Sequence, residues 1–441
     1  MTEVPSQLSD SHDGLHTVPG IRIPKYVIMD GVSFENLSTL LRVDINSPID
    51  PDTGKILDTT RIRSHLPTIE KLVRQNAKVI LLAHQGQKGE KDFISLRQHA
   101  KVLSEMLHTD VQFADKSRDG YSEDQIRSLG NGQVLMLENV RFLAEETANV
   151  SMKAHAESKF VQCVSRVSDV YINDAFAAAH RNQASLVGFP FILPSFAGLL
   201  MSHELQEISR ALNSSSRPNV FLIGGGKVRD SIKLVTALLR SGLADNLILY
   251  GLVGNIFLRA RGRRLGTKFD AYLRERKLDA EVSAARELLE RYGDKIILPK
   301  DVAVLREGER RDVDFAEIMD SDEVLDIGMK TIDTISNRLE GCKSAFVRGP
   351  PGVIEREGFE LGTEAVLQLL AEKGIFTIIG GGHTRIIAEK LKLVDRLGYA
   401  STGGGALLTL LSGGSLPALE ALELGVERTM AWLVNRRGSR N

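Results

Sequence analysis

The segment FTIIGGGHTRIIAEKL, residues 376–391, combines an apolar run, three glycines and an amphipathic helical pattern. Because glycine has no Cβ, the backbone N–H groups of such a loop can approach a ligand closely, and the helix N-terminus adds positive partial charge. The loop is therefore suited to an anion, above all phosphate. His383 follows the glycines, and its side chain could contact that phosphate or its metal. A histidine that only caps the helix would give the same sequence pattern.

The second half of the chain holds four glycine-rich loops: GGGK at 224–227, RGPPG at 348–352, GGG at 380–382 and STGGG at 401–405. One such loop is weak evidence, because glycine more often makes a tight turn than a phosphate cradle, but four together predict a nucleotide site. Neither common nucleotide loop fits. A P-loop requires Ser or Thr after its lysine, where this chain has Val228, and a GxGxxG pattern starting at Gly224 meets Arg229.

The first half is rich in Arg, His, Asp and Asn at the ends of strand-like runs. These residues lie in RVDINSP at 42–48, TRIRSHLPTI at 60–69, AHQGQKG at 83–89, LENVRF at 137–142 and NDAFAAAHR at 173–181. One arginine alone would be explained by a solvated surface or a structural ion pair. Their clustering predicts a site for a small phosphorylated acid.

The elements that must position these residues form a repeating pattern of apolar runs and helical segments. The runs are KVILLA, QVLMLE, DVYINDAF, NVFLIGGG, NLILYG, KIILP, SAFVRG and FTIIGGG. Continuous Val/Ile/Leu runs are typical of strands buried on both faces, and their alternation with helices predicts parallel α/β sheets. Ligands bind at the carboxyl ends of such strands. The Ser-rich stretch ALNSSSRPNV at 211–220 indicates a junction between two domains.

Composition favours a two-domain protein with small-molecule partners. The chain has 441 residues, of which 42% are hydrophobic and 26% charged, and a net charge of −1, so neither nucleic acid nor a membrane is an expected partner. Cys163 and Cys342 are far apart and outside any CxxC pattern, which argues against disulfides and zinc and favours a cytoplasmic location. The polar N-terminus and the short apolar run FPFILPSFAGLLM predict neither a signal peptide nor a membrane span.

Nine motifs, in order and at their intervals, resemble the phosphoglycerate kinase family, most of all its archaeal members. They are RVDINSP, TRIRSHLPTI, LENVRF, NDAFAAAHR, GGGKVRDSI, LDIGMKTI, RGPPGVIE, GGGHT and STGGGALLTLLSGGSLPALEAL, and they span about residues 38–425. The resemblance implies an α/β fold of two Rossmann-like lobes with six-stranded parallel cores. It also implies hinge-bending, in which the two lobes close to bring the substrates together.

The resemblance divides the chain into functional segments. Residues 21–194 would form the N-terminal lobe that binds 3-phosphoglycerate, and residues 195–218 an interdomain helix and linker. Residues 219–424 would form the C-terminal nucleotide-binding lobe, and residues 425–441 would return to the first lobe. Residues 1–20 are polar and are expected to be a disordered tail.

The activity implied is reversible phosphoryl transfer between ATP, with Mg²⁺, and the carboxylate of 3-phosphoglycerate, catalysed by a monomer. A carboxylate is already ionised near neutrality, so the transfer needs no general base and depends on cancellation of charge. Two alternatives stay open: a related kinase for a different carboxylic acid, and a non-catalytic nucleotide-binding protein. Retention of both Arg61 and Lys227 argues against the second, because a binding protein does not need charge from both lobes.

The family's functional residues carry over onto positions of this sequence. Arg61 and Lys227 are the expected catalytic residues. The substrate-binding set is Asp44, Asn46, Arg61, His84, Arg141 and Arg181. The nucleotide-binding set is Gly225, Gly226, Lys227, Arg348, Glu355, Gly380, Gly381, Gly382, His383 and Thr384, with Glu355 on the ribose.

In the nucleotide lobe the chain departs from the family pattern at four positions. His383 replaces an aspartate that approaches magnesium, and Mg²⁺ prefers oxygen ligands, so we expect no residue to hold the metal directly. Arg348 replaces an asparagine, Ser231 a lysine, and Tyr250 a glycine near the adenine. Since a guanidinium can clasp phosphate oxygens in two places, we expect Arg348 to take over from the missing lysine.

In the substrate lobe Gln87 replaces an arginine of the 3-phosphate site. A charged contact to phosphate is worth about 1.5–3 kcal/mol when buried, so the loss bears on substrate choice. Lys88 and Lys91 are near enough in sequence to substitute, and a different acid substrate stays an alternative.

Overall fold

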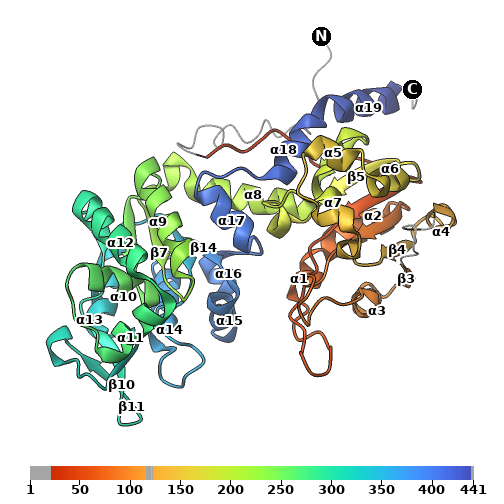
Figure 1. The fold of residues 1–441 in the computed structure, drawn as a ribbon. Coiled ribbons are helices and arrows are strands. Elements are labelled where there is room, and N and C mark those ends of the chain that lie inside the picture. Colours follow the sequence, from red (N-terminus) through yellow and green to blue (C-terminus); the bar gives the residue numbers. More distant parts are fainter. Residues whose placement is uncertain (1–20, 116–120, 122, 439–441) are drawn as a thin grey trace. The chain divides into compact units, whose positions relative to one another are not determined.

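The computed structural model describes residues 21–115, 121 and 123–438, so the predicted tail at 1–20 lies outside the described residues. The chain divides into two compact units (Figure 1). The first unit contains Arg22–Gln206 and the segment from Ser415 onward, and the second contains Glu207–Gly414. The return to the first unit therefore begins at Ser415 and not at the expected residue 425.

The first unit is built on a six-stranded sheet in which every pairing is parallel, with the strand order β3-β4-β2-β1-β5-β6. The runs in β1, β2, β4 and β5 are almost wholly buried, as expected of strands covered on both faces. The strands are β1 (Ser38–Arg42), β2 (Lys78–Leu82), β3 (Val111–Ala114), β4 (Val134–Leu137), β5 (Val170–Asn173) and β6 (Ser195–Ala197).

Helices connect and cover these strands. The helices are α1 (Thr60–Ser64), α2 (Leu66–Arg74), α3 (Arg97–Leu107), α4 (Glu123–Arg127), α5 (Met152–Ala156), α6 (Lys159–Ser165), α7 (Ala184–Val187), α18 (Pro417–Leu424) and α19 (Val426–Gly438), with 3-10 turns η2 (Val140–Phe142), η3 (Ala144–Thr147), η4 (Phe176–Ala178) and η5 (Phe189–Phe191). Side chains of α2, α3 and α19 share one hydrophobic core with alternate residues of the central strands.

The C-terminal helices α18 and α19 pack against the first unit. The Ala418 N–H donates to the Ala179 carbonyl at 3.1 Å, and the Trp432 ring meets Phe196 of β6 edge-on at 5.8 Å. The Ser195 N–H donates to the Thr429 hydroxyl at 2.8 Å. These contacts explain why the return begins before α18 and not after it.

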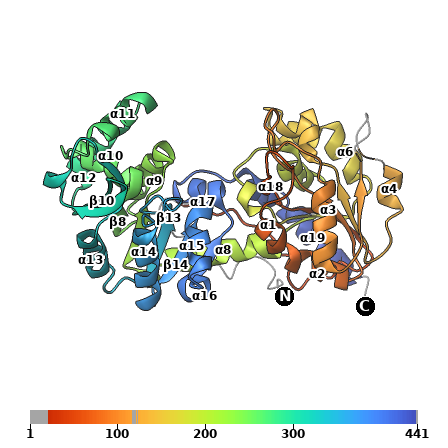
Figure 2. The ribbon, with the colours of Figure 1, turned by 90° about the horizontal axis from the view of Figure 1, so that it is seen from below.

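The second unit repeats the parallel design with the strand order β15-β14-β13-β7-β8-β9. Helices α9, α10 and α12 lie on one side of the strands, and α13 and α14 lie on the other (Figure 2). The strands are β7 (Asn219–Ile223), β8 (Asn246–Leu249), β9 (Ile296–Ile297), β13 (Ser344–Arg348), β14 (Phe376–Gly380) and β15 (Gly398–Ser401).

The helices that belong to this unit, together with the connecting helix α8, complete the element order. They are α8 (Leu199–Leu212), η6 (Ser214–Ser216), α9 (Val228–Ser241), α10 (Gly251–Ala260), α11 (Thr267–Arg276), α12 (Asp279–Tyr292), η7 (Phe315–Glu317), α13 (Met329–Arg338), α14 (Leu361–Glu372), α15 (Gly382–Lys390), α16 (Val394–Leu397) and α17 (Gly404–Leu411). Every helix of the described residues is too short or too polar to cross a lipid bilayer.

A three-stranded antiparallel sheet, which the sequence analysis did not predict, is added to the second unit. Its order is β11-β10-β12, with β10 at Val302–Arg306, β11 at Glu309–Val313 and β12 at Glu323–Ile327. Strand β11 reads ERRDV and is mostly exposed, so it lacks the apolar run that identifies buried strands. The predicted α/β fold with two parallel six-stranded cores is confirmed.

Candidate active site

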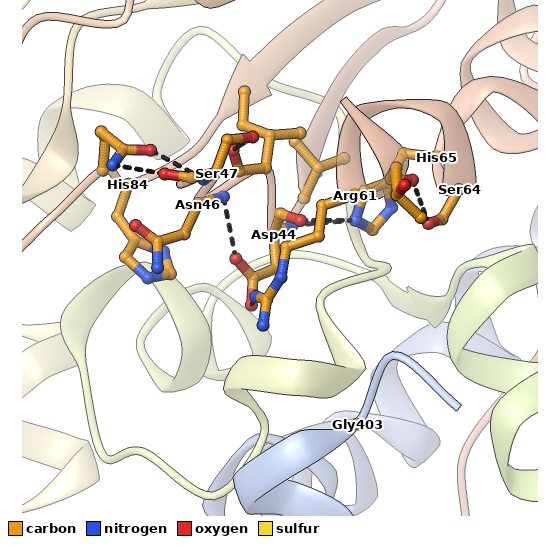
Figure 3. Close-up of polar contacts among 12 residues, drawn as sticks. Asp44, Asn46, Ser47, Arg61, Ser64, His65, His84 and Gly403 are labelled. Atoms are coloured by element: carbon orange, nitrogen blue, oxygen red, sulfur yellow. Dashed lines mark hydrogen bonds and ion pairs between the residues drawn. The ribbon is translucent and has the colours of Figure 1, made fainter. Parts of the chain in front are cut away.

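The carboxyl edge of the first sheet carries Asp44, Asn46 and Arg61 (Figure 3). Asp44 follows β1 and is 5% exposed. One of its oxygens, Oδ2, accepts from Arg61 Nη1 at 2.8 Å, and the other, Oδ1, accepts from the Asn46 N–H at 3.2 Å. The Arg61 side chain comes from α1 and is 38% exposed, so it can meet a ligand without leaving its carboxylate partner.

His84 lies at the same edge, after β2, and is neutral. The buried Arg42 guanidinium approaches His84 Nδ1 at 3.0 Å. Because a guanidinium only donates, Nδ1 must accept and the ring proton sits on Nε2. Burial, the largest cause, lowers the pKa of His84 to about 3; Asp44 opposes this shift, and the charges of Arg42, Arg181 and Arg61 add to it. His84 therefore offers an uncharged N–H donor.

Asp44 is held in its ionised form. Burial alone would raise its pKa, but the positive charge around it, including Arg61 and Arg42, keeps the pKa well below its usual range. A carboxylate that is already paired with arginine does not supply a proton acceptor. The edge of the sheet is thus a site for binding an anion through fixed donors.

Two residues that the sequence analysis did not assign, His65 and Asp174, hold the backbone of Asp44 in place. The Asp44 N–H donates to His65 Nε2 at 3.0 Å, and His65 Nδ1 lies 2.9 Å from Asp174 Oδ2. Both side chains are buried, so the loop after β1 is tied to the loop after β5. They belong to the motifs TRIRSHLPTI and NDAFAAAHR, whose spacing does not reveal which members turn inward.

A cavity beside this edge holds the remaining basic residues of the predicted substrate site. Lys88, Arg141 and Arg181 line it together with Gln87, whereas Lys91 is not among its lining residues. Arg141 donates through Nη1 to the Gly86 carbonyl, and its buried Nε has no protein partner. Of the two lysines expected to substitute for the missing arginine, Lys88 lines this cavity and Lys91 does not.

In the second unit three glycines allow the loops after β7, β8 and β13 to pack tightly. A Cβ on Gly349 would lie 2.5 Å from the Gly224 carbonyl oxygen, and a Cβ on Gly251 would lie 2.9 Å from the Pro350 carbonyl oxygen. The Gly225 N–H donates to the same Pro350 oxygen at 3.0 Å. These glycines are required by packing, which brings three strand ends to one place.

Three further glycines border open space. A Cβ on Gly226, Gly381 or Gly382 would meet no atom within 4 Å, so a ligand can approach their backbone closely. Gly380 differs, because it is the last residue of β14 and a Cβ there would lie 3.2 Å from Leu407. The packing of α17 explains this glycine, although it was predicted to bind nucleotide.

A pocket of about 470 Å³ lies beside these loops and has the size of a ligand site. Its polar lining includes Gly225, Gly226, Asn255, Lys268, Glu323, Asp326, Glu355 and His383. Its apolar lining includes Leu252, Phe269, Tyr272, Pro299, Leu325 and Val353. The arrangement suits a ligand with a flat apolar part and a charged tail.

Lys227 and Arg348 carry positive charge next to the glycine loops, at the start of α9 and the end of β13. Lys227 is exposed at the N-terminus of α9, and among the described residues no ion pair or hydrogen bond engages its ammonium. Arg348, at the end of β13, donates from Nη1 to the Ser231 hydroxyl at 2.7 Å. The guanidinium therefore reaches the helix position at which the family has its second lysine.

His383 faces Glu355, with His383 Nδ1 3.8 Å from Glu355 Oε1 and the two side chains 65% and 62% exposed. The neighbouring Thr384 hydroxyl is buried without a partner. Within the described residues no group of three or more His, Cys, Asp or Glu side chains is arranged to hold a metal ion.

Tyr250 does not lie on the pocket surface, although its position was expected to be near the adenine. Its side chain is fully buried in the core of the second unit, and its ring occupies the space beside Gly224. The larger residue therefore fills the interior and leaves the pocket open.

A parallel α/β unit with an arginine-rich anion site and another with glycine loops beside an apolar pocket define a small-molecule phosphotransferase. The chain belongs to the phosphoglycerate kinase family, whose model, described as phosphoglycerate kinase, matches residues 29–414. This confirms the predicted family and the prediction that the chain is an enzyme, a phosphotransferase with a carboxyl group as acceptor.

Relatives and solved structures agree with this assignment. The phosphoglycerate kinase of Methanothermus fervidus is 41% identical over 92% of this chain and 98% of its own length. The phosphoglycerate kinase of Sulfolobus acidocaldarius is 38% identical over 92% of this chain and 98% of its own length. The crystal structure of the Pyrococcus horikoshii enzyme has a TM-score of 0.84 at 37% identity, covering 91% of this chain and 99% of that one. The Coxiella burnetii structure has a TM-score of 0.76 at 31% identity, covering 92% and 100%.

Proposed function

We propose that the chain transfers a phosphoryl group reversibly between MgATP and the carboxylate of 3-phosphoglycerate, giving 1,3-bisphosphoglycerate and ADP in glycolysis or gluconeogenesis. The observation that carries the proposal is the pairing of Arg61 with Asp44 beside a neutral His84. This edge offers fixed donors and no free base. A carboxylate acceptor is already ionised and needs no general base. A site with hydrogen-bond donors and no general base is therefore suited to phosphoryl transfer to a carboxylic acid.

In this proposal each substrate-lobe residue has a defined role. Arg61 neutralises the substrate carboxylate and the transferring phosphoryl group, and Asp44 and Asn46 orient the glycerate. The N–H of His84 and the cations of Arg141 and Arg181 hold the 3-phosphate. The lining of the adjoining cavity supports adding Lys88 to this set in place of the arginine lost at Gln87.

In the nucleotide lobe, Lys227 and Arg348 neutralise the phosphates, and Gly226, Gly381 and Gly382 present backbone N–H groups. Gly225 contributes through the close approach of its backbone, because its own N–H donates to the Pro350 carbonyl. Glu355 holds the ribose. His383 and Thr384 donate to phosphate or water. Mg²⁺ enters as part of the nucleotide substrate, held by phosphate oxygens and water, because it prefers oxygen ligands to the imidazole at position 383.

The working form proposed is a cytoplasmic monomer whose lobes close about the α8 region. In this proposal the first unit, with Arg22–Gln206, provides the acid site, and the second unit, with Glu207–Gly414, provides the nucleotide site. The physical reason for closure is that Arg61 and Lys227 come from different units and must act on one phosphoryl group. The low net charge of −1 supports small molecules as the only required partners.

The deciding experiment is coupled turnover of MgATP with 3-phosphoglycerate, with glycerate and other unphosphorylated acids as controls. Turnover that requires the 3-phosphate supports the proposal. Turnover with an unphosphorylated acid alone would favour the related kinase, an alternative kept open by Gln87. Tight ADP binding without turnover of any acid would indicate a nucleotide-binding protein.

A further inference from the structure

The apolar part of the pocket in the second unit contains one polar side chain that the family resemblance did not assign. Gly251, Leu252 and Asn255 all line the pocket, and all lie in the first two turns of α10. Residues three and four apart share one face of a helix, so Asn255 is on the same face as the loop residues that begin α10. Its amide therefore borders the pocket.

Asn255 is 8% exposed, and no hydrogen bond joins its amide to another described residue. Neither amide atom is among the buried side-chain atoms without a partner, so the amide reaches the solvent that fills the pocket and can meet a ligand there. Two carboxylates of the lining differ: Asp326 accepts from Arg310 Nη1 and from the Gly362 N–H, each at 2.8 Å, and Glu323 lies 3.2 Å from Arg356. The third, Glu355, is 62% exposed. Asn255 is thus a largely buried residue of this wall whose amide has no protein partner and is open to a ligand.

We propose that Asn255 recognises the purine base of the nucleotide and favours adenine. The inference rests on the proposed function, since it assumes that this pocket holds the nucleotide. An asparagine amide presents one acceptor and two donors close together, which matches the amino donor of adenine and the ring nitrogen next to it. The flat apolar walls formed by Leu252, Phe269 and Leu325 would hold the base, and the amide would fix which edge it presents.

The test compares three nucleotides on the full chain: ATP, GTP, and purine riboside triphosphate, which lacks the exocyclic amino group. Asn255→Leu removes both the donor and the acceptor. Asn255→Asp leaves acceptors only, which suit the N–H groups of guanine. Asn337→Asp is the matched control, because it adds the same charge to an exposed position of α13 in the same unit.

We expect wild type to prefer ATP over purine riboside triphosphate by on the order of tenfold in kcat/KM, as one good base contact provides. In Asn255→Leu the kcat/KM values for ATP and purine riboside triphosphate should agree within about twofold. In Asn255→Asp the GTP/ATP ratio should rise by on the order of tenfold, while Asn337→Asp keeps the wild-type ratios. Unchanged ratios in both Asn255 variants would overturn the inference.

Equilibrium binding of ADP, GDP and purine riboside diphosphate, measured in parallel by calorimetry, separates this inference from the proposed function. If wild type turns over no acid but binds ADP with the preference above, the catalytic proposal fails and the role of Asn255 stands. If Asn255→Leu shows no cooperative unfolding and is therefore not properly folded, Asn255→Asp alone tests the inference, because aspartate has nearly the same shape as asparagine. A wild type with equal affinity for all three diphosphates would contradict base recognition.

Discussion

Arg61 Nη1 lies 2.8 Å from Asp44 Oδ2, so the guanidinium proposed to act on the transferring phosphoryl group is already oriented by a buried carboxylate. Asp44 is in turn fixed through its backbone by His65 and Asp174. A flexible arginine would lose side-chain entropy on meeting the substrate, about 1.5–2 kcal/mol, and this pair has lost most of it in advance. The relation makes Arg61 the first residue to test.

Arg61→Ala should lower kcat by at least about a hundredfold while leaving folding and ADP affinity close to wild type, because the charge acts mainly in the transition state. Steady-state kinetics with both substrates and calorimetric ADP binding would measure this. Arg63→Ala, on the exposed face of the same helix, is the control and should be near wild type. A rise in KM for the acid with kcat unchanged would mean that Arg61 only binds substrate.

Lys227→Ala should reduce kcat sharply, whereas Glu355→Ala should mainly raise KM for ATP. Among the described residues no ion pair or hydrogen bond engages the Lys227 ammonium at the start of α9, so it can interact with the phosphoryl group during its transfer. A contact between Glu355 and the ribose would be the same in the ground state and the transition state, so its loss should affect binding of ATP and not kcat. The comparison requires full kinetics for both variants, with Lys233→Ala on the exposed side of α9 as control. Equal effects on kcat would remove the distinction between the two roles.

Lys88→Ala should raise KM for 3-phosphoglycerate by roughly tenfold, as a charged contact to phosphate provides, and Lys91→Ala should change it by less than about twofold. Both side chains are exposed, so the difference rests on their positions relative to the cavity. Only Lys88 lines the cavity with Arg141 and Arg181. The measurement is KM at two salt concentrations, since a phosphate contact weakens as salt screens it. Equal effects of both lysines would show that they act through the general field of the surface.

The buried His84 should make the fold less stable in acid. Its pKa in the folded chain is about 3, below the unfolded value of about 6.5, so the unfolded chain binds the extra proton as pH falls from 6.5 toward 3. Stability is complete above pH 6.5 and is lost at about 1.4 kcal/mol per pH unit within that window. Urea unfolding between pH 4.5 and 6.5 should give a shallower slope for His84→Gln, by about one proton. Identical slopes would show that His84 is protonated in the folded state.

His383→Asp should raise KM for MgATP, because the new carboxylate would stand beside phosphates and close to Glu355, which already lies 3.8 Å from His383. Lower salt should enlarge the effect. Arg348→Asn added to it should restore part of the loss if the two positions have adjusted to each other. A double-mutant cycle on kcat/KM at two salt concentrations measures the coupling.

Two results would refute that account. Strictly additive effects would leave His383 as a residue that merely begins the helix. A gain in apparent Mg²⁺ affinity in the single variant would place the metal close enough to accept a ligand at position 383.

The linear order of residues was enough to determine the family and the parallel α/β architecture. Motifs such as RVDINSP are continuous, and strands buried on both faces, such as β2 and β7, must be apolar along their length. The same order led to the prediction that Arg61 is catalytic, because the motif TRIRSHLPTI contains it. Strand β11 escaped prediction since a mostly exposed, charged edge strand has no apolar signature.

Only the tertiary structure decided which neighbours in sequence become neighbours in space. Lys88 and Lys91 are equivalent by sequence distance, yet one lines the cavity. Tyr250 occupies the place of a pocket glycine but turns into the core, and Gly380 serves the packing of Leu407. His65 is a candidate positioning residue because it is buried and accepts from the Asp44 N–H, and Asn255 is a candidate ligand contact because its amide has no protein partner. The physical reason is that side-chain direction, desolvation and hydrogen bonding are set by contacts between distant segments, which no local pattern of residues contains.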